Sequence, residues 1–423
     1  MRTIVIGSAL FNWGETHRMV SIGLELQKRG FRIVYLGEGK YDYLLGNTGF
    51  TRALVPGDEE WFTEERISKM MDMDTYVNDY TTFEELNRQI QWEVEVMKKY
   101  DPVMVITGYR TTLSISARVI KVPLVWIMSS AVSKSFFSKQ IASLPENSIL
   151  NRYFEKGKME KNKDVMLSFV KKMVAIYNET SKVWNEVNDK YGLPHFESDL
   201  DIFKGELNIV SDPLEFGEEE DGYKYCGPIF LREKIEMPDV TADMDKSSKK
   251  KIFVILGSSG KKENFVSVLD AVNGLDYEFY IASNHTLSEE EKEKYPGNCH
   301  FSDRFPVYEM TQKVDACITN GGQGTIYPVL AAGKPFVGIA LFMEQQYNLE
   351  TLTNRNYGIL MQKSDITAEK MRDALDRVLY DDTYISAAKD GAKIVEKYYF
   401  DPEFYAEKKT ADFIEEYLNE KAD

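Results

Sequence analysis

The stretch ITNGGQGTIYPVLAAGKPFVGIALFMEQQYN, residues 318–348, is the most informative run in the chain, because its pattern runs from strand to glycine turn to helix and back to strand. Gly321, Gly322 and Gly324 allow positive φ angles and the close approach of a ligand to the backbone. A helix is predicted to start near Thr325, and its first amides together with the helix dipole form an anion site. A diphosphate suits such a site. The alternative interpretation is an ordinary glycine-rich turn between strand and helix.

A second glycine turn, LGSSGKK at residues 256–262, follows the first strand of the same domain. Gly257, Ser258 and Ser259 offer amides and hydroxyls to the same phosphates. Neither turn has the spacing of a P-loop or of the dinucleotide-binding G-x-G-x-x-G pattern.

The segment that follows the helix predicted near Thr325 is expected to be a strand, FVGIALFM, that ends on Glu344 and Gln345. A carboxylate and an amide beside a diphosphate accept from and donate to vicinal hydroxyls, as holding a sugar requires. A solvated polar loop is the other interpretation. Pro328 is expected in the first turn of the preceding helix, where its missing N–H costs nothing, and Gly333 is expected to end that helix.

Strand and helix patterns alternate along most of the chain, which predicts parallel sheets covered by helices. We expect an α/β fold with two Rossmann-like, doubly wound domains facing across a cleft. The predicted parts are an N-terminal domain at 1–231 with a helical insertion at 131–200, a linker at 232–250, a C-terminal domain at 251–398, and a helix at 399–423 that packs back on the N-terminal domain.

Composition narrows the class of protein. The 423 residues carry a formal net charge of -16, which argues against a nucleic acid partner because phosphate binding needs a basic surface. The three cysteines form no C-x-x-C pair, which is typical of a reducing compartment. No apolar run approaches the roughly 18 residues of a membrane span, so a cytoplasmic location is expected.

The motif T-N-G-G-x-G-T, followed by A-A-G-x-P, a strand, and Glu-Gln with Asn three residues on, resembles the nucleotide-sugar signature of GT-B fold glycosyltransferases. The UDP-glycosyltransferase (family 1) and MurG-like group is the most similar. DRFPVYEM at 303–310 and YCGPI at 225–229 are further marks of that family. The resemblance is strong over 251–379, fainter over the first strand and helix and over 101–130, and absent across 131–200.

The resemblance implies an inverting, metal-independent transfer of a sugar from a nucleotide diphosphate donor, a UDP-sugar, with no cofactor besides that cosubstrate. Asn320 stands where many members have His, and Pro328 stands where most have the Glu that binds the ribose hydroxyls. Arg304 and the backbone of Phe305 would face the base. The donor-contacting residues are expected to be Gly14, Gly257, Ser258, Ser259, Arg304, Phe305, Asn320, Gly321, Gly322, Gln323, Gly324, Thr325, Glu344 and Gln345.

The general base is the least defined part of the predicted site. Family members commonly have a His after Gly near the first helix, and the gapless alignment from Gly14 places Glu15 there and His17 two residues later. The Asp of the usual dyad is missing, because Thr107 and Gly108 occupy its place. Either Glu15 serves as the base directly, its pKa adjusted by the site, or His17 reaches the acceptor. In a third interpretation both residues only cap the helix.

The acceptor is expected to bind the N-terminal domain and to be a hydroxyl-bearing small molecule, natural product or lipid. The segment 131–172 is locally basic, so contact with an anionic membrane surface is one interpretation and a solvated helix face is the other. Aromatic residues between Trp61 and Trp92 line either an acceptor pocket or a domain core. Whether the chain forms a homodimer stays open.

No metal site is expected. The two D-x-D strings, Asp72/Asp74 and Asp243/Asp245, lie in polar segments and are interpreted as solvated surface. Two other functions remain as alternatives on the same scaffold. One is a nucleotide-sugar epimerase, and the other is a glycosyltransferase-like binding or helper protein whose catalysis is impaired by loss of the His/Asp dyad.

Overall fold

The computed structural model describes the chain in two compact units. The N-terminal unit comprises Met1–Ile141, Arg152–Leu231 and Pro402–Asp423, and the C-terminal unit comprises Ala142–Asn151 and Arg232–Asp401. The structure describes all residues except 11, 62, 64–65, 67–80, 133–142, 144, 147–181, 198, 218, 231–234, 258–261 and 422–423.

A seven-stranded parallel sheet forms the centre of the described part of the N-terminal unit, in the order β3-β2-β1-β4-β5-β6-β7. Val5 of β1 pairs in register with Val34 of β2 and Val105 of β4, and all three are buried because helices cover both faces. The strands are β1 Thr3–Gly7, β2 Arg32–Leu36, β3 Thr51–Ala53, β4 Met104–Thr107, β5 Leu124–Met128, β6 Leu207–Val210 and β7 Tyr223–Tyr225.

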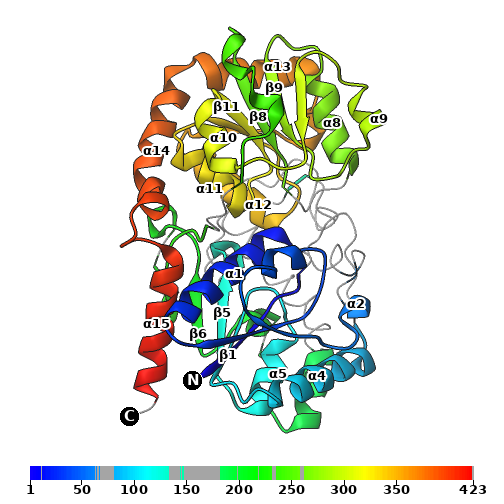
Figure 1. Ribbon diagram of the computed structural model, residues 1–423, viewed down its shortest axis with the longest axis vertical. Helices are drawn as coiled ribbons and strands as arrows, with labels where there is room; N and C mark the ends of the chain where they lie inside the picture. The colour runs from blue at the N-terminus through cyan, green and yellow to red at the C-terminus, as the bar shows by residue number, and fades with distance from the viewer. Residues whose placement is uncertain are drawn as a thin grey trace. The chain divides into compact units, whose positions relative to one another are not determined.

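The helices of this unit include one from the C-terminal tail. Figure 1 shows α15 running beside α1, and the Arg29 guanidinium at the end of α1 joins Asp412 and Glu415 of α15. The helices are α1 Trp13–Lys28, α2 Asp58–Trp61, α4 Phe83–Lys98, α5 Leu113–Ile120 and α15 Ala406–Glu420, with a further helix at 182–191 and 3-10 turns η1 Asp42–Leu45, η2 Ser130–Val132, η4 Asp199–Phe203 and η5 Leu214–Phe216.

A six-stranded parallel sheet forms the centre of the described C-terminal unit, in the order β10-β9-β8-β11-β12-β13. Its core is built from β-branched and aromatic residues such as Val254, Phe279 and Ile318. The strands are β8 Lys251–Ile255, β9 Glu278–Ala282, β10 Cys299–Ser302, β11 Ala316–Thr319, β12 Phe336–Gly338 and β13 Gly358–Leu360.

Helices cover this second sheet as well. Figure 1 shows α11 beside α14. The two helices pack closely because Gly391 has no side chain: a Cβ there would lie 2.6 Å from Leu330 Cδ1. The helices are α8 Lys262–Val272, α9 Glu289–Lys292, α10 Val307–Lys313, α11 Gln323–Ala331, α12 Met343–Thr353, α13 Ala368–Tyr380 and α14 Asp382–Phe400, with 3-10 turns η6 Asp239–Thr241, η7 Met244–Lys246 and η8 Lys363–Asp365.

In both sheets the strand order reverses at one point, between β1 and β4 and between β8 and β11. Ligands of doubly wound sheets bind outside the carboxyl ends of the strands at such switch points. The predicted α/β class with two parallel sheets is confirmed. Among the described residues, no helix has the length and apolarity needed to cross a membrane.

Two sequence-based expectations are wrong: the end of the strand FVGIALFM and the first-turn position of Pro328. The strand expected at FVGIALFM ends at Gly338, and α12 begins at Met343. Between them the Leu341 amide donates to the Gln345 side chain at 2.9 Å. Glu344 and Gln345 therefore lie in the first turn of α12. The helix expected near Thr325 starts at Gln323, so Pro328 lies in its second turn and withholds the usual N–H from the Gly324 carbonyl.

Candidate functional site

The turn between β11 and α11 lies at the switch point of the C-terminal sheet. Gly321 has φ +81°, and a Cβ there would lie 2.5 Å from Leu349 Cγ, so only glycine fits both the backbone and the packing. Asn348 Nδ2 of α12 donates to the Gly321 carbonyl at 2.9 Å. The turn is therefore held rigidly from a neighbouring helix, as an anion site requires.

The amides of this turn divide into two groups. Gly322 N–H donates to Asn320 Oδ1 at 3.3 Å, and Thr325 N–H donates to the Gly322 carbonyl at 2.9 Å. The Gly324 amide has no partner within the part of the chain that the structure describes. It lies in the first turn of α11, where the positive end of the helix dipole favours an anion. The Gly322 and Thr325 amides must give up these hydrogen bonds before they can bind a diphosphate together with the Gly324 amide.

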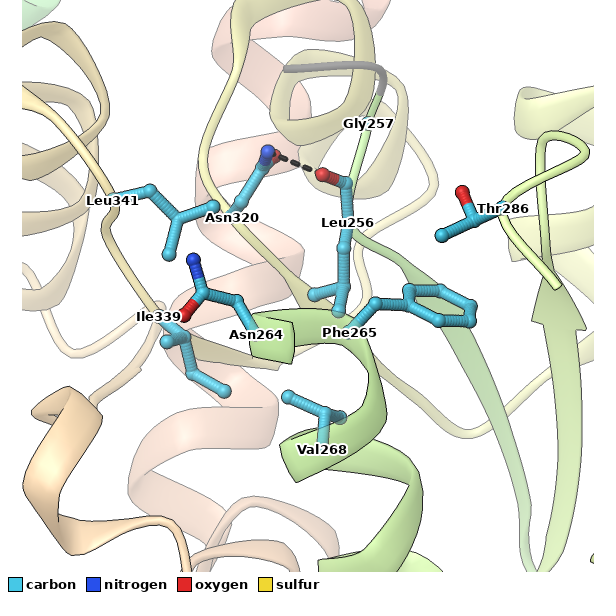
Figure 2. Close-up of a pocket in the computed structure, with 9 residues that line it drawn as sticks. All are labelled: Leu256, Gly257, Asn264, Phe265, Val268, Thr286, Asn320, Ile339 and Leu341. Atoms are coloured by element: carbon cyan, nitrogen blue, oxygen red, sulfur yellow. Dashed lines mark hydrogen bonds between the residues drawn. The ribbon is translucent and has the colours of Figure 1, made fainter. Parts of the chain in front are cut away.

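Asn320 joins this turn to the one after β8. Figure 2 shows its side chain directed at the Leu256 carbonyl, to which Nδ2 donates a hydrogen bond. Gly257 has φ +66°, and a Cβ there would lie 3.0 Å from Asn320 Nδ2, so glycine makes this approach possible. Both polar groups of Asn320 have protein partners, which makes it a residue that shapes the site.

A pocket opens beside these two turns (Figure 2). Its polar lining includes Asn320 and Asn264, and its apolar lining comes mainly from α8 and the segment after β12. The lining residues are Leu256, Gly257, Asn264, Phe265, Val268, Thr286, Asn320, Ile339 and Leu341.

The remaining expected donor residues differ in how they are placed. Arg304 is exposed after β10, whereas Phe305 is 4% exposed and its ring lies edge-on against Phe253 at 5.3 Å. Glu344 is half-buried in the first turn of α12, whereas Gln345 is buried with its Oε1 on the Leu341 amide. Ser258 and Ser259 lie outside the described residues.

Glu15 lies at the switch point of the N-terminal sheet. Asn12 caps α1 by accepting the Glu15 amide, and the Glu15 side chain then crosses to the carboxyl ends of β1 and β4. Oε1 accepts from Tyr109 N–H at 2.7 Å, while Oε2 accepts from Ser8 Oγ at 3.1 Å and Ala9 N–H at 3.3 Å.

Burial governs the chemistry of this carboxyl group, which is 1% exposed. Desolvation raises the pKa of Glu15, opposed by the Arg18 charge and by the three donors that surround the carboxylate. A Cβ on Gly108 would lie 3.3 Å from Glu15 Cγ, so Glu15 lies next to the position where the family's dyad Asp is expected. A general base must contact the acceptor hydroxyl. Glu15 can therefore act as the base only if the residues that bury its carboxylate move apart.

His17 is engaged by the backbone on both sides of its ring. Nδ1 lies 3.2 Å from the Trp13 carbonyl and Nε2 lies 3.0 Å from the Ile229 carbonyl, and the residue is 4% exposed. Desolvation lowers the pKa of His17 to about 4, although the two carbonyls oppose this. These contacts favour a structural role for His17 and leave Glu15 as the stronger candidate for the base.

The burial of His17 should make the stability of the folded protein depend on pH. The folded-state pKa of His17 is below the ordinary value of 6.5, so the neutral ring contributes stability above pH 6.5 that is lost as the pH falls toward 4. At most about 3 kcal/mol is involved. Thermal unfolding at pH 7 and pH 5 should show a smaller loss of Tm for His17→Gln than for the unmodified chain. Equal losses would contradict this account, and His195→Gln, at an exposed His, is the control.

Sequence reasoning missed a buried ion network beside Glu15. Arg110, fully buried, binds Asp58 at 2.6 and 2.9 Å and Glu93 at 2.7 Å. It also donates to the Ser8 carbonyl at 3.4 Å, and Ser8 Oγ donates to Glu15. Arg110 and Ser8 thereby connect the network to the Glu15 carboxylate.

Other predicted features contribute little to the site. Asp243 and Asp245 lie at an exposed 3-10 turn, whereas Asp72, Asp74 and most of the basic segment 131–172 lie outside the described residues. The described residues contain no group of three or more His, Cys, Asp or Glu arranged to hold a metal ion. Trp61 and Trp92 belong to the packed N-terminal unit.

Known proteins place the chain within a class. The family described as "Erythromycin biosynthesis protein CIII-like, C-terminal domain" matches residues 266–399. The PGL/p-HBAD biosynthesis glycosyltransferase of Mycobacterium tuberculosis (strain H37Ra) is 24% identical over 336 residues, which cover 77% of this chain and 74% of the relative. The fold and these matches support a GT-B glycosyltransferase.

Solved structures agree with this fold. The glycosyltransferase of kitacinnamycin has a TM-score of 0.70 at 16% identity and covers 99% of both chains. The spinosyn rhamnosyltransferase SpnG complexed with thymidine diphosphate has a TM-score of 0.63 at 14% identity, covering 93% of this chain and 96% of that one. Together with the family match, the comparisons support a glycosyltransferase of the natural-product type.

Proposed function

We propose that the protein transfers a sugar, with inversion and without a metal ion, from a nucleoside diphosphate donor to a hydroxyl of a small-molecule, natural-product or lipid acceptor. The observation that carries this proposal is the turn at Asn320–Thr325, where α11 presents its N-terminus at the switch point of the sheet. Amides and the helix dipole at that point stabilise the negative charge of the departing diphosphate. Glu15 is the proposed base.

The nucleotide is proposed to be uridine or thymidine diphosphate. The family resemblance favours UDP. Pro328, buried in α11, offers no acceptor where most UDP-using members have the ribose-binding Glu. A deoxyribose has one hydroxyl fewer than a ribose, so a deoxyribonucleotide loses less binding energy when Pro328 replaces the Glu. One solved neighbour is complexed with thymidine diphosphate. Calorimetric titration with both diphosphates distinguishes the two donors.

The turn itself can be tested by Gly321→Ala. The new Cβ meets Leu349 and the residue must keep φ +81°, so the turn shifts, at a cost of about 1–3 kcal/mol. Affinity for the nucleoside diphosphate should fall roughly tenfold, since 1.4 kcal/mol corresponds to a factor of ten. Gly274→Ala is a matched control, with φ +76° and no neighbour within 4 Å. Equal affinity in both variants would contradict the anion site.

Product analysis distinguishes transfer from the two alternative functions. The full chain is incubated with UDP- and dTDP-sugars in the presence of EDTA and a panel of hydroxylated acceptors. Release of nucleoside diphosphate that increases with an acceptor, together with a glycosylated product of inverted anomeric configuration, supports the proposal. A changed sugar without diphosphate release would indicate an epimerase, and tight binding without turnover would indicate a binding protein.

A further inference from the structure

The turn after β9 lies beside the proposed phosphate site but has no role in it so far. Asn284 Nδ2 donates to the Gly257 carbonyl at 3.3 Å, where the turn after β8 begins. Thr286 lines the same pocket as Gly257 and Asn320 (Figure 2). His285 lies between these two residues, so its backbone is at the edge of the proposed diphosphate site.

The backbone of this turn is held in an uncommon conformation. Asn284 and His285 have φ +49° and +59°, and consecutive non-glycine residues in this region are unusual. Asp303, after β10, holds the turn by accepting Ser283 Oγ at 2.5 Å and His285 N–H at 3.1 Å. Strain of this kind persists where surrounding structure enforces it, often at ligand-binding turns.

Asp303 also orients the imidazole. His285 Nδ1 lies 2.9 Å from Asp303 Oδ2, while the side chain is 79% exposed. Because Asp303 engages Nδ1, Nε2 points away from the carboxylate, and it has no protein partner among the described residues. An exposed side chain that is already oriented loses little entropy when it binds a ligand.

Several other side-chain nitrogens near this edge have partners among the described residues. Asn320 and Asn284 donate to carbonyls, Lys262 pairs with Glu291, and Lys292 pairs with Glu289 and Asp303. We propose that His285, in its doubly protonated form with Nδ1–H on Asp303, donates a hydrogen bond from Nε2–H to the diphosphate of the donor, with Asp303 as its positioning residue. This inference rests on the proposed function and adds a contact to the sugar-nucleotide donor outside the glycine turns.

The test is His285→Asn. Asparagine tolerates φ +59° and places an amide nitrogen where Nδ1 lies, so the turn and the Asp303 contact are kept while Nε2 is removed. Calorimetry with UDP, dTDP, inorganic pyrophosphate, uridine and thymidine should show about tenfold weaker binding of the three diphosphates and unchanged nucleoside binding. His285→Gln, whose amide reaches about as far as Nε2, should restore part of the affinity.

His195→Asn is the matched control, because His195 pairs with Asp189 at 2.6 Å in the N-terminal unit and should leave all affinities unchanged. Unchanged diphosphate binding in His285→Asn, with Tm retained, would overturn the inference and leave the proposed function standing. Equal weakening of nucleosides would assign His285 to the nucleoside and overturn the diphosphate contact. Failure of the unmodified chain to bind any of the diphosphates would overturn the proposed function itself.

Discussion

Replacement of Glu15 by Gln should lower the rate of sugar transfer by about 10²- to 10⁴-fold, the usual contribution of a positioned general base. Glutamine keeps the volume of the side chain but cannot take a proton from the acceptor hydroxyl. The effect should fall on kcat, while the dissociation constant of the nucleoside diphosphate stays the same, because the glycine turn lies in the other unit. The measurement is acceptor-dependent release of the diphosphate at saturating donor.

Glu25→Gln is the matched control for this result. Glu25 is also buried in α1 but pairs with Lys28 and Arg29 at the far end of the helix, so its replacement should leave kcat unchanged. Full activity of Glu15→Gln would contradict the base assignment. Loss of activity in both variants would indicate a structural effect of α1 rather than catalysis by Glu15.

Replacement of Arg110 by Met should destabilise the N-terminal unit by about 3–5 kcal/mol, because Asp58 and Glu93 are then buried without a counter-charge. Thr112 and Ser116 still donate to Glu93, each at 2.5 Å, but hydroxyl donors do not replace the guanidinium charge. Chemical denaturation followed by tryptophan fluorescence reports the change, since Trp126 is buried in this unit.

Arg52→Met provides the comparison for this prediction. Arg52 pairs with Asp42 at 3.0 Å, but both side chains are about one-third exposed, so the loss should be at most about 1 kcal/mol. Similar losses in the two variants would show that burial does not decide the strength of these pairs. A stable Arg110→Met protein would mean that the two carboxyl groups take up protons without cost.

The sequence predicted the parts of this structure that depend on local chemistry. Glycine at positions 321 and 333 produces the left-handed backbone expected from its freedom at φ, at +81° and +64°. The strands that frame the switch points are buried, β-branched runs, which are recognisable without the fold. The α/β class and the place of the glycine turn followed from these features.

Side-chain contacts between distant residues decided what the sequence left open. Arg110 meets partners 52 and 17 residues away, and no local pattern announces such pairs. His17 contacts the carbonyl of Ile229, which lies 212 residues away in the sequence. Because no local pattern predicts that contact, the sequence left Glu15 and His17 as alternatives for the base. Gln345 was expected at a strand end, but it lies in the first turn of α12 and accepts the Leu341 amide. Strands β3 and β13 are too short to predict.

The turn at Asn320–Thr325 is proposed to hold the departing diphosphate. A crystal structure of the full chain with UDP or dTDP would show whether it does. Phosphate oxygens should lie within hydrogen-bond distance of backbone amides between Gly322 and Thr325, with Gly324 N–H among the donors. A nucleotide bound elsewhere, with the diphosphate away from the start of α11, would contradict it.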